Sequence, residues 1–305
     1  MKPYGLPYKG SKSRIAVELC SMLPSADHFY DLFVGGGAMA HRAILENRWK
    51  HVHINDINPL IPELFNDAIN GKYHDESRWV GRKEFLRERE RDGYVAVMWS
   101  FGNNLRNYMY NEEIEPLKKA MHFAICGEWD AMNKFGVDLS SIRDIPSRYH
   151  RRIKAQNIIK RSLEKPVGYV ADNFELVQRL VVCESLERQE RLQSLERLHR
   201  FKDKLTTSST DYREVEILPN SVVYCDVPYA GTDGYVTDFN HEEFYDWACE
   251  QERIYISSYW MPEDRFECVA EFKNRSTYSK DSNATQATER LFIPKGNHHI
   301  KTTLF

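Results

Sequence analysis

Apolar positions in the first seventy residues follow the pattern of an α/β unit. Residues 13–23 carry apolar side chains at helical spacing, and Pro24 ends that pattern. Residues 28–34 form a short apolar run, typical of a buried strand, that leads into three glycines. Residues 38–46 are again helical, and residues 51–54 alternate as a second strand does. The predicted order is strand, glycine turn, helix, strand.

The pattern changes after residue 70. Residues 71–166 are rich in charged and aromatic side chains with few β-branched runs, which predicts an inserted, mostly helical domain. Residues 179–205 predict a long amphipathic helix, and strands are expected at 221–225, 253–257 and 290–293. We therefore expect an α/β protein in which residues 1–70 and 167–305 form one domain around the insert.

Composition excludes several classes of protein. With 42% hydrophobic and 29% charged residues, the 305-residue chain has enough apolar surface for a globular core. Its mean hydropathy is −0.60 and it lacks the long apolar run of a membrane span. Residues 1–10 do not resemble a secretory signal, and the six cysteines show no metal-ligand spacing. We expect a cytoplasmic protein, without a metal, whose net charge of −3 demands local basic patches for any polyanion.

The glycine turn suits a nucleotide-like ligand. Gly35, Gly37 and Ala40 fit the spacing G-x-G-x-x-A between a predicted strand and a predicted helix. Asp56 follows Gly35 by 21 residues, where a βαβ unit places the acid that binds a ribose. A tight turn with Asp56 as a helix cap would explain the same residues. A nicotinamide dehydrogenase and a methyltransferase both satisfy the pattern.

The segment Asp226-Val227-Pro228-Tyr229 follows a predicted strand, at the sheet edge where open α/β folds bind ligands. Methylation of an exocyclic amine requires acceptors for its hydrogens, which the Asp226 carboxylate and the Val227 carbonyl can supply. Pro228 favours an extended Val227, and Tyr229 can stack on a base. The ordinary alternative is a strand end, with Asp226 as a turn acceptor and Tyr229 half-buried.

Together these segments resemble the Dam-like, D12 class of N6-adenine DNA methyltransferases over most of the chain. Residues 7–12 (PYKGSK) look like the N-terminal motif of that family, residues 31–37 (DLFVGGG) like its cofactor motif and residues 54–59 (INDINP) like its ribose motif. Residues 226–229 (DVPY) resemble its catalytic D-P-P-Y, with Val227 in place of a proline.

The resemblance implies a Rossmann-like, S-adenosylmethionine-dependent methyltransferase sheet with an inserted helical target-recognition domain. It also implies that the target adenine is flipped out of duplex DNA onto Asp226, Val227, Pro228 and Tyr229. Tyr8, Lys12, Asp31 and the glycine turn would hold the methionine end of the cofactor, Asp56 its ribose, and Asp211-Tyr212 its adenine. The complete set of cofactor residues is Tyr8, Lys12, Asp31, Phe33, Gly35, Gly37, Asp56, Asp211 and Tyr212.

Two segments of the insert are candidates for holding DNA. Residues 145–163 contain six basic residues and no acidic one, as expected for phosphate contacts: Arg148, Arg151, Arg152, Lys154, Lys160 and Arg161. A solvated helix face is the alternative. Residues 98–110 combine aromatic rings with groups able to read base edges, namely Asn103, Asn104, Arg106 and Asn107. A packed helix junction explains this second segment equally well.

Other classes of protein remain as alternatives. A catalytically silent DNA-binding relative would keep the motifs, and an NAD-dependent oxidoreductase would share the glycine turn. Methylation of RNA or of protein amides fits less well, since amide methylators more often carry Asn at the position of Asp226. We expect a monomer that binds double-stranded DNA and S-adenosylmethionine and has no membrane contact.

Overall fold

A computed structural model describes residues 3–228, 239–274 and 287–296. By its internal contacts the chain divides into two compact units. Residues 1–72 and 195–305 make up the first, and the inserted second unit is Tyr73–Ser194. The insert begins close to the expected residue 71 but extends beyond the expected residue 166. Helices α8 (Tyr169–Asp172) and α9 (Phe174–Gln178) pack on α7 (Arg148–Glu164), and α10 (Glu184–Gln193) packs on α5 (Gly93–Met98), which is why residues 167–194 belong to the insert.

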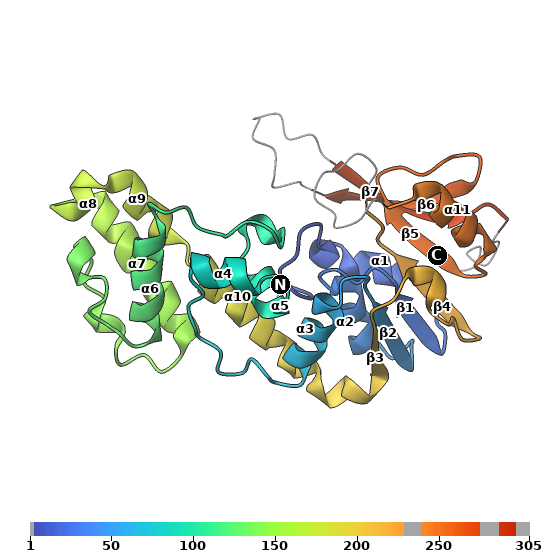
Figure 1. The fold of residues 1–305 in the computed structure, drawn as a ribbon, viewed down its shortest axis with the longest axis horizontal. Helices are drawn as coiled ribbons and strands as arrows, with labels where there is room; N and C mark the ends of the chain where they lie inside the picture. The colour runs from blue at the N-terminus through green and yellow to red at the C-terminus, as the bar shows by residue number, and fades with distance from the viewer. Residues whose placement is uncertain (1–2, 229–238, 275–286, 297–305) are drawn as a thin grey trace. The chain divides into compact units, whose positions relative to one another are not determined.

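The first unit is built on a seven-stranded sheet (Figure 1). The strand order is β3 (Leu205–Ser208), β2 (His51–Asn55), β1 (His28–Asp31), β4 (Ser221–Cys225), β5 (Ile254–Ser258), β7 (Ala287–Pro294) and β6 (Phe266–Asn274). Strand β7 runs antiparallel to β5 and β6, and the other neighbours are parallel. The sheet is therefore mixed and mostly parallel, in agreement with the expected Rossmann-like class. Strands β3 and β6 were not expected from the sequence.

Helices of the first unit connect these strands. They are η1 (Lys12–Arg14), α1 (Ala16–Met22), α2 (Ala38–Leu45), α3 (Leu60–Ile69), η6 (Ser194–Lys204), η7 (Tyr212–Glu214) and α11 (His241–Glu250). The prediction of one long helix over residues 179–205 is wrong. The chain forms the short 3₁₀ turn η5 (Arg179–Val181), an extended Val182, helix α10 and then η6. Two successive β-branched valines disfavour a continuous helix at this break.

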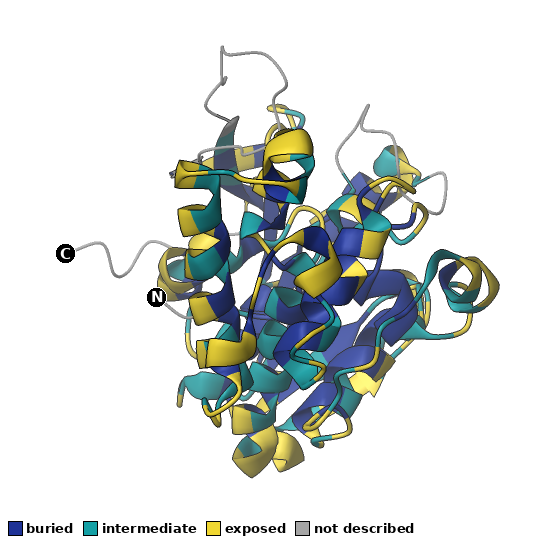
Figure 2. Ribbon diagram, turned by 90° about the vertical axis from the view of Figure 1, so that its left-hand side faces the viewer, coloured by how far each residue is buried: buried dark blue, intermediate teal, exposed yellow. Residues whose placement is uncertain are grey.

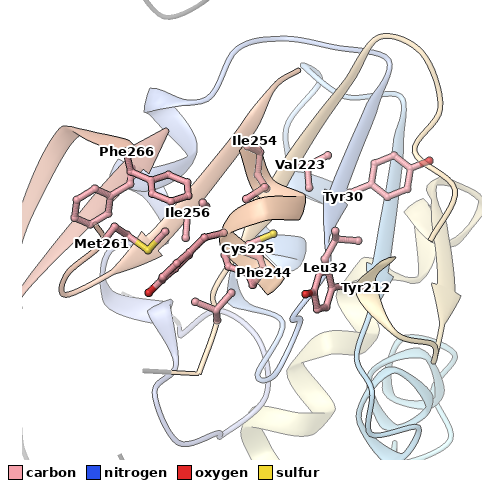
Figure 3. Packing of buried hydrophobic residues seen from close by; sticks show 14 residues of the cluster. Tyr30, Leu32, Tyr212, Val223, Cys225, Phe244, Ile254, Ile256, Met261 and Phe266 are labelled. Atoms are coloured by element: carbon pink, nitrogen blue, oxygen red, sulfur yellow. The ribbon is translucent and has the colours of Figure 1, made fainter. Parts of the chain in front are cut away.

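Strand alternation gives the sheet two faces: one is covered by an apolar cluster, and the other, which we call the polar face, carries buried ionisable side chains among apolar ones. Tyr30, Leu32, Val223, Cys225 and Ile256 share the apolar cluster with side chains of α11 (Figure 3). The residues between them on β1 and β4 project to the opposite face, because successive side chains of a strand alternate. All five residues of β4 and of β5 are buried. Figure 2 colours the buried residues of the chain dark blue. Polar groups on the second face are therefore held in a low-dielectric environment.

The inserted unit consists of short helices. They are α4 (Arg82–Glu88), α5 (Gly93–Met98), η2 (Phe101–Asn103), α6 (Glu115–Cys126), η3 (Asn133–Phe135), η4 (Ser140–Ile142), α7 (Arg148–Glu164), α8 (Tyr169–Asp172), α9 (Phe174–Gln178), η5 and α10. Helix α7 packs on α6 and α9, and α10 packs on α5. No helix among the described residues has the length and apolar character needed to cross a membrane.

A buried lysine holds the insert together at the end of η5. Lys118 is 2% exposed, and its Nζ lies 2.6 Å from the Arg179 carbonyl, 2.5 Å from that of Val182 and 2.7 Å from Glu184 Oε2. Carbonyls at the end of a helical turn lack partners within the turn, so the ammonium satisfies groups that would otherwise be buried unpaired.

Replacing Lys118 by methionine is expected to lower the free energy of unfolding by about 2 kcal/mol, because the side chain keeps its apolar stem while two carbonyls lose a donor. Urea denaturation of the whole chain measures the change. The control is Lys119→Met at the next, exposed position, expected to stay within about 0.5 kcal/mol of the wild type. Equal stability of the two variants would contradict this role of Lys118.

Candidate active site

The glycine turn lies between β1 and α2 and adopts backbone conformations that favour glycine. Gly35 and Gly37 have φ of +44° and +63°, and Gly37 is the N-cap of α2. The Gly36 carbonyl accepts a hydrogen bond of 2.6 Å from the Leu6 amide. A Cβ on Gly36 would lie 2.9 Å from Cβ of Tyr8. The segment around Leu6 and Tyr8 therefore packs directly on the turn.

Asp56 is fixed against the same turn. Its Oδ2 accepts from the Gly35 amide at 3.0 Å, and its Oδ1 accepts from the Asn58 amide at 3.0 Å. Burial raises the pKa of Asp56, and these two amides oppose the rise. The preceding Asn55 donates to the carbonyls of Leu32 and Thr210, which ties β2 to the neighbouring loops. The ends of β1 and β2 thus form one rigid edge.

Asp31 ends β1 on the polar face of the sheet. It is 2% exposed, and its Oδ2 lies 3.2 Å from the Ala40 amide in α2. Burial raises the pKa of Asp31 to about 8, and the nearby Asp226 is the next largest cause. A cation beside Asp31 would restore its negative charge.

Lys12 and Asp226 form a buried ion pair. Lys12 Nζ lies 2.6 Å from Oδ1 and 2.8 Å from Oδ2 of Asp226, although the two residues are 214 positions apart in the sequence. Lys12 is 4% exposed. Burial raises the pKa of Asp226 to about 6, which Lys12 opposes and Glu289 increases. The pKa of Lys12 is raised although burial lowers it, because Asp226 and Glu289 favour its charged form.

Glu289 on β7 is a member of this cluster that the sequence analysis missed. It is 2% exposed, lies 3.7 Å from Lys12 Nζ and accepts a hydrogen bond of 2.8 Å from the Ser257 hydroxyl. In the sequence its only signal is an acid that alternates with Leu291 and Ile293 in an apolar strand. An acid in this position is equally typical of a strand whose polar side chains face solvent.

The expected adenine-binding pair, Asp211 and Tyr212, is found beside an aromatic cluster. Tyr212 is 9% exposed, and its ring lies 5.3 Å from that of Phe33 and 4.9 Å from that of Trp247. Asp211 is bound by Arg213 at 2.8 Å, which lowers the pKa of its carboxyl. Phe33 and Tyr212 are thus brought together, while the Asp211 carboxylate already has a partner.

The segment after β4 is described as far as Pro228. Val227 is 3% exposed and packs in the apolar cluster. The valine that stands in place of the family proline therefore fills space in the core. The Pro228 carbonyl lies 2.9 Å from His241 Nε2, which connects the segment to α11. Tyr229, the expected stacking residue, lies outside the described residues.

Residues 8–155 match the family of D12 class N6 adenine-specific DNA methyltransferases. The match covers just under half of the 305 residues, and over this stretch the chain is similar to that family. No curated protein matches the chain. The matched stretch contains the glycine turn, Asp56 and most of the insert, whereas Asp226 lies outside it. The protein is thus an S-adenosylmethionine-dependent DNA adenine methyltransferase, and the assignment of its catalytic residues depends on the geometry above.

Helix α7 of the methyltransferase carries the basic residues expected to bind phosphate, and half of them have internal partners. Arg152 is 6% exposed and its guanidinium binds Glu187 at 2.7 Å and Glu190 at 2.8 Å. Arg148 donates to the Glu76 carbonyl, and Arg151 to the Ile125 carbonyl. The guanidinium groups of these three arginines are therefore engaged within the insert. Lys154, Lys160 and Arg161 are exposed.

The expected base-reading residues of the methyltransferase lie in one loop, which the Ser100–Tyr108 bridge closes. The Asn103 amide donates to the Val97 carbonyl at 3.0 Å, and Asn104 Oδ1 accepts from the amides of Arg106 and Asn107. The asparagines at 103 and 104 therefore shape the loop. Arg106 and Asn107 are exposed, as is Phe101, whose side chain the sequence analysis did not single out.

Among the described residues of the methyltransferase, no group of three or more His, Cys, Asp or Glu side chains has the arrangement of a metal site.

Proposed function

We propose that the protein transfers a methyl group from S-adenosylmethionine to N6 of an adenine that it flips out of duplex DNA, at a specific sequence. The observation that carries this proposal is the buried Lys12–Asp226 pair, at the carboxyl edge of the sheet and on the same face as Asp31. A carboxylate held there by an ammonium is an oriented acceptor for the hydrogens of an amine.

Residues around the glycine turn fit the cofactor. Gly35 is partly exposed in the turn before α2, so a ligand can approach the backbone there, and the firmly held Asp56 can accept from the two ribose hydroxyls. The buried Asp31, whose pKa of about 8 a neighbouring cation would lower, suits the ammonium of the methionine end. The aromatic ring of Phe33, beside Tyr212, suits the adenine. When bound, S-adenosylmethionine supplies an electrophilic methyl group.

Asp226 and the Val227 carbonyl are proposed to bind the two hydrogens of the adenine amine. The amine lone pair would form the new bond to the methyl carbon as the bond from that carbon to sulfur breaks, and the electron pair of the broken bond would leave with S-adenosylhomocysteine. The amine then loses one proton, which the Asp226 carboxylate can accept. With a pKa of about 6, Asp226 is ionised at neutral pH and still basic enough to take that proton. Tyr229 is proposed to stack on the flipped base. Positioning contributes more to such a reaction than acid strength.

The insert is proposed to be the part that recognises DNA. Lys154, Lys160 and Arg161 on α7 would contact phosphates, and Arg106 and Asn107 would read base edges. The exposed ring of Phe101, 62% accessible, lies in the same loop as these two residues. Double-stranded DNA in the cytoplasm of a bacterium or of a phage-infected cell is the proposed substrate, bound by a monomer.

The deciding experiment is transfer of labelled methyl groups to unmethylated plasmid DNA, followed by single-molecule sequencing. A recurring short motif with N6-methyladenine would support both the reaction and its sequence specificity. No incorporation by a protein that binds S-adenosylmethionine would instead indicate a silent DNA-binding relative. In that case Val227→Pro would be the first variant to test for restored transfer.

The phosphate role of α7 predicts a salt-dependent effect. A Lys160→Ala, Arg161→Ala double variant is expected to reduce the slope of log affinity against log salt by about 2, since each phosphate contact adds about one unit. Affinity for duplex DNA is measured by fluorescence anisotropy at several salt concentrations. Lys50→Ala is the control, because that exposed lysine lies just before β2 in the first unit, outside the insert. An unchanged slope in the double variant would exclude α7 as the phosphate surface.

A further inference from the structure

Two carboxylates share one ammonium on the polar face of the sheet. Lys12 Nζ lies 2.6 Å from Asp226 and 3.7 Å from Glu289, and all three side chains are at most 23% exposed. One positive and two negative charges leave this cluster with a net charge of −1 when all are ionised. In a buried site that charge is weakly screened.

Glu289 is held in place independently of Lys12. Its Oε1 accepts from the Ser257 hydroxyl at 2.8 Å, and Ser257 is fully buried on β5, the strand that pairs with β7. Ser257 pairs with Leu291, two residues after Glu289, so both polar side chains project to the same face. A buried acid held by a neighbouring strand has a fixed distance to the ammonium, whereas a mobile surface acid does not.

We propose that Glu289 is a positioning residue for methyl transfer, which shares Lys12 with Asp226 and thereby leaves Asp226 a strong hydrogen-bond acceptor. The inference rests on the proposed function of Asp226. If Lys12 were paired with Asp226 alone, the neutral pair would accept a hydrogen bond from the adenine amine less strongly. The second carboxylate also supplies the net negative charge that favours a positive centre in the site, first on sulfur and then on the methylated amine.

Several titratable groups of the surrounding elements interact electrostatically with Asp226. They are Lys12 from η1, Asp31 from β1, Tyr224 and Cys225 from β4, Tyr259 after β5 and Glu289 from β7. Glu289 raises the pKa of Asp226 and Lys12 lowers it. Since transfer requires ionised Asp226, activity is lost as the pH falls through this pKa. Removal of the Glu289 charge must therefore lower the pKa of Asp226 and move the acid limb of the pH–activity profile to lower pH.

The test is Glu289→Gln, which keeps the shape of the side chain. We expect kcat to fall about tenfold and the acid limb of kcat/KM to move down by about one pH unit. Lys12→Met is expected to move the same limb to higher pH. A merely structural role of Glu289 would lower kcat without moving the limb, and that result would overturn the proposal.

A binding measurement provides a readout that does not need turnover. Calorimetry compares S-adenosylmethionine, which carries a positive sulfur, with the neutral S-adenosylhomocysteine. Glu289→Gln is expected to weaken binding of the first relative to the second by at least about threefold. Equal weakening of both would contradict the charge argument.

The matched control is Glu271→Gln on the adjacent strand β6, where an exposed acid pairs with Arg290. It removes the same charge at the surface and is expected to match the wild type in kcat, acid limb and binding ratio. If the wild type methylates no adenine, the proposed function fails, and the binding ratio still tests Glu289 on its own.

Discussion

Asp226→Ala is expected to abolish methyl transfer, with a loss of at least about 10³-fold in kcat, because the amine loses its charged acceptor. Cofactor binding is expected to survive, since Gly35 and Asp56 bind each other without help from Asp226. Incorporation of tritiated methyl groups measures the first effect, and calorimetry with S-adenosylmethionine measures the second. A variant with the activity of the wild type would remove Asp226 from the catalytic site.

The alanine variant also leaves the Lys12 ammonium buried without its closest carboxylate, which can destabilise the fold. Asp226→Asn separates the two effects, because the amide keeps the shape and one acceptor oxygen while it removes the charge. We expect Asp226→Asn to melt close to the wild type and to remain strongly impaired in transfer. Asp246→Ala, at an exposed acid of α11 that pairs with Arg265, is the control for loss of an aspartate.

The second large effect is expected from Gly5→Ala. Gly5 has a φ of +67°, and a Cβ there would lie 2.1 Å from the Gly36 carbonyl oxygen and 2.8 Å from the Ala38 amide. Both obstacles are backbone atoms of the glycine turn and cannot rotate away. Left-handed strain of about 1–2 kcal/mol and overpacking of about 1–3 kcal/mol predict a loss of about 4 kcal/mol in stability.

Gly10→Ala is a control from the same segment. Gly10 has a φ of +79°, and a Cβ there would meet nothing within 4 Å, so only about 1 kcal/mol of backbone strain is expected. Urea denaturation compares the two variants, and calorimetry follows cofactor binding. If both variants lose the same stability, the segment around Gly5 does not pack on the glycine turn as described.

The sequence predicted those elements whose pattern lies within a short stretch of the chain. The apolar run before Gly35, the helix after Gly37 and the alternation at residues 51–54 correspond to β1, α2 and β2. Strand β3 was not recognised because its residues, Leu205–Ser208, are partly exposed and form an edge of the sheet. An edge strand lacks the apolar run that marks a buried one.

The sequence predicted the individual residues of the site from their motifs, but not the contacts between them. Asp226 and Lys12 were each singled out, but nothing in the spacing indicated that they bind each other. Glu289 joins them through strand pairing with β5, which depends on the register of a distant segment. In the insert, nothing in the sequence distinguished the six basic residues of 145–163 from one another. Which of them are exposed depends on partners such as Glu187 and Glu190, which lie on another helix.

The wide sequence separation within the charge cluster also bears on how the protein is made. Lys12 is synthesised early, Asp226 follows 214 residues later and Glu289 comes later still. A nascent chain on the ribosome can already form β1, α2 and β2, because their contacts are local, whereas pairing with β7 must wait for the late residues. The cluster of Lys12, Asp226 and Glu289 is therefore incomplete until translation has passed β7.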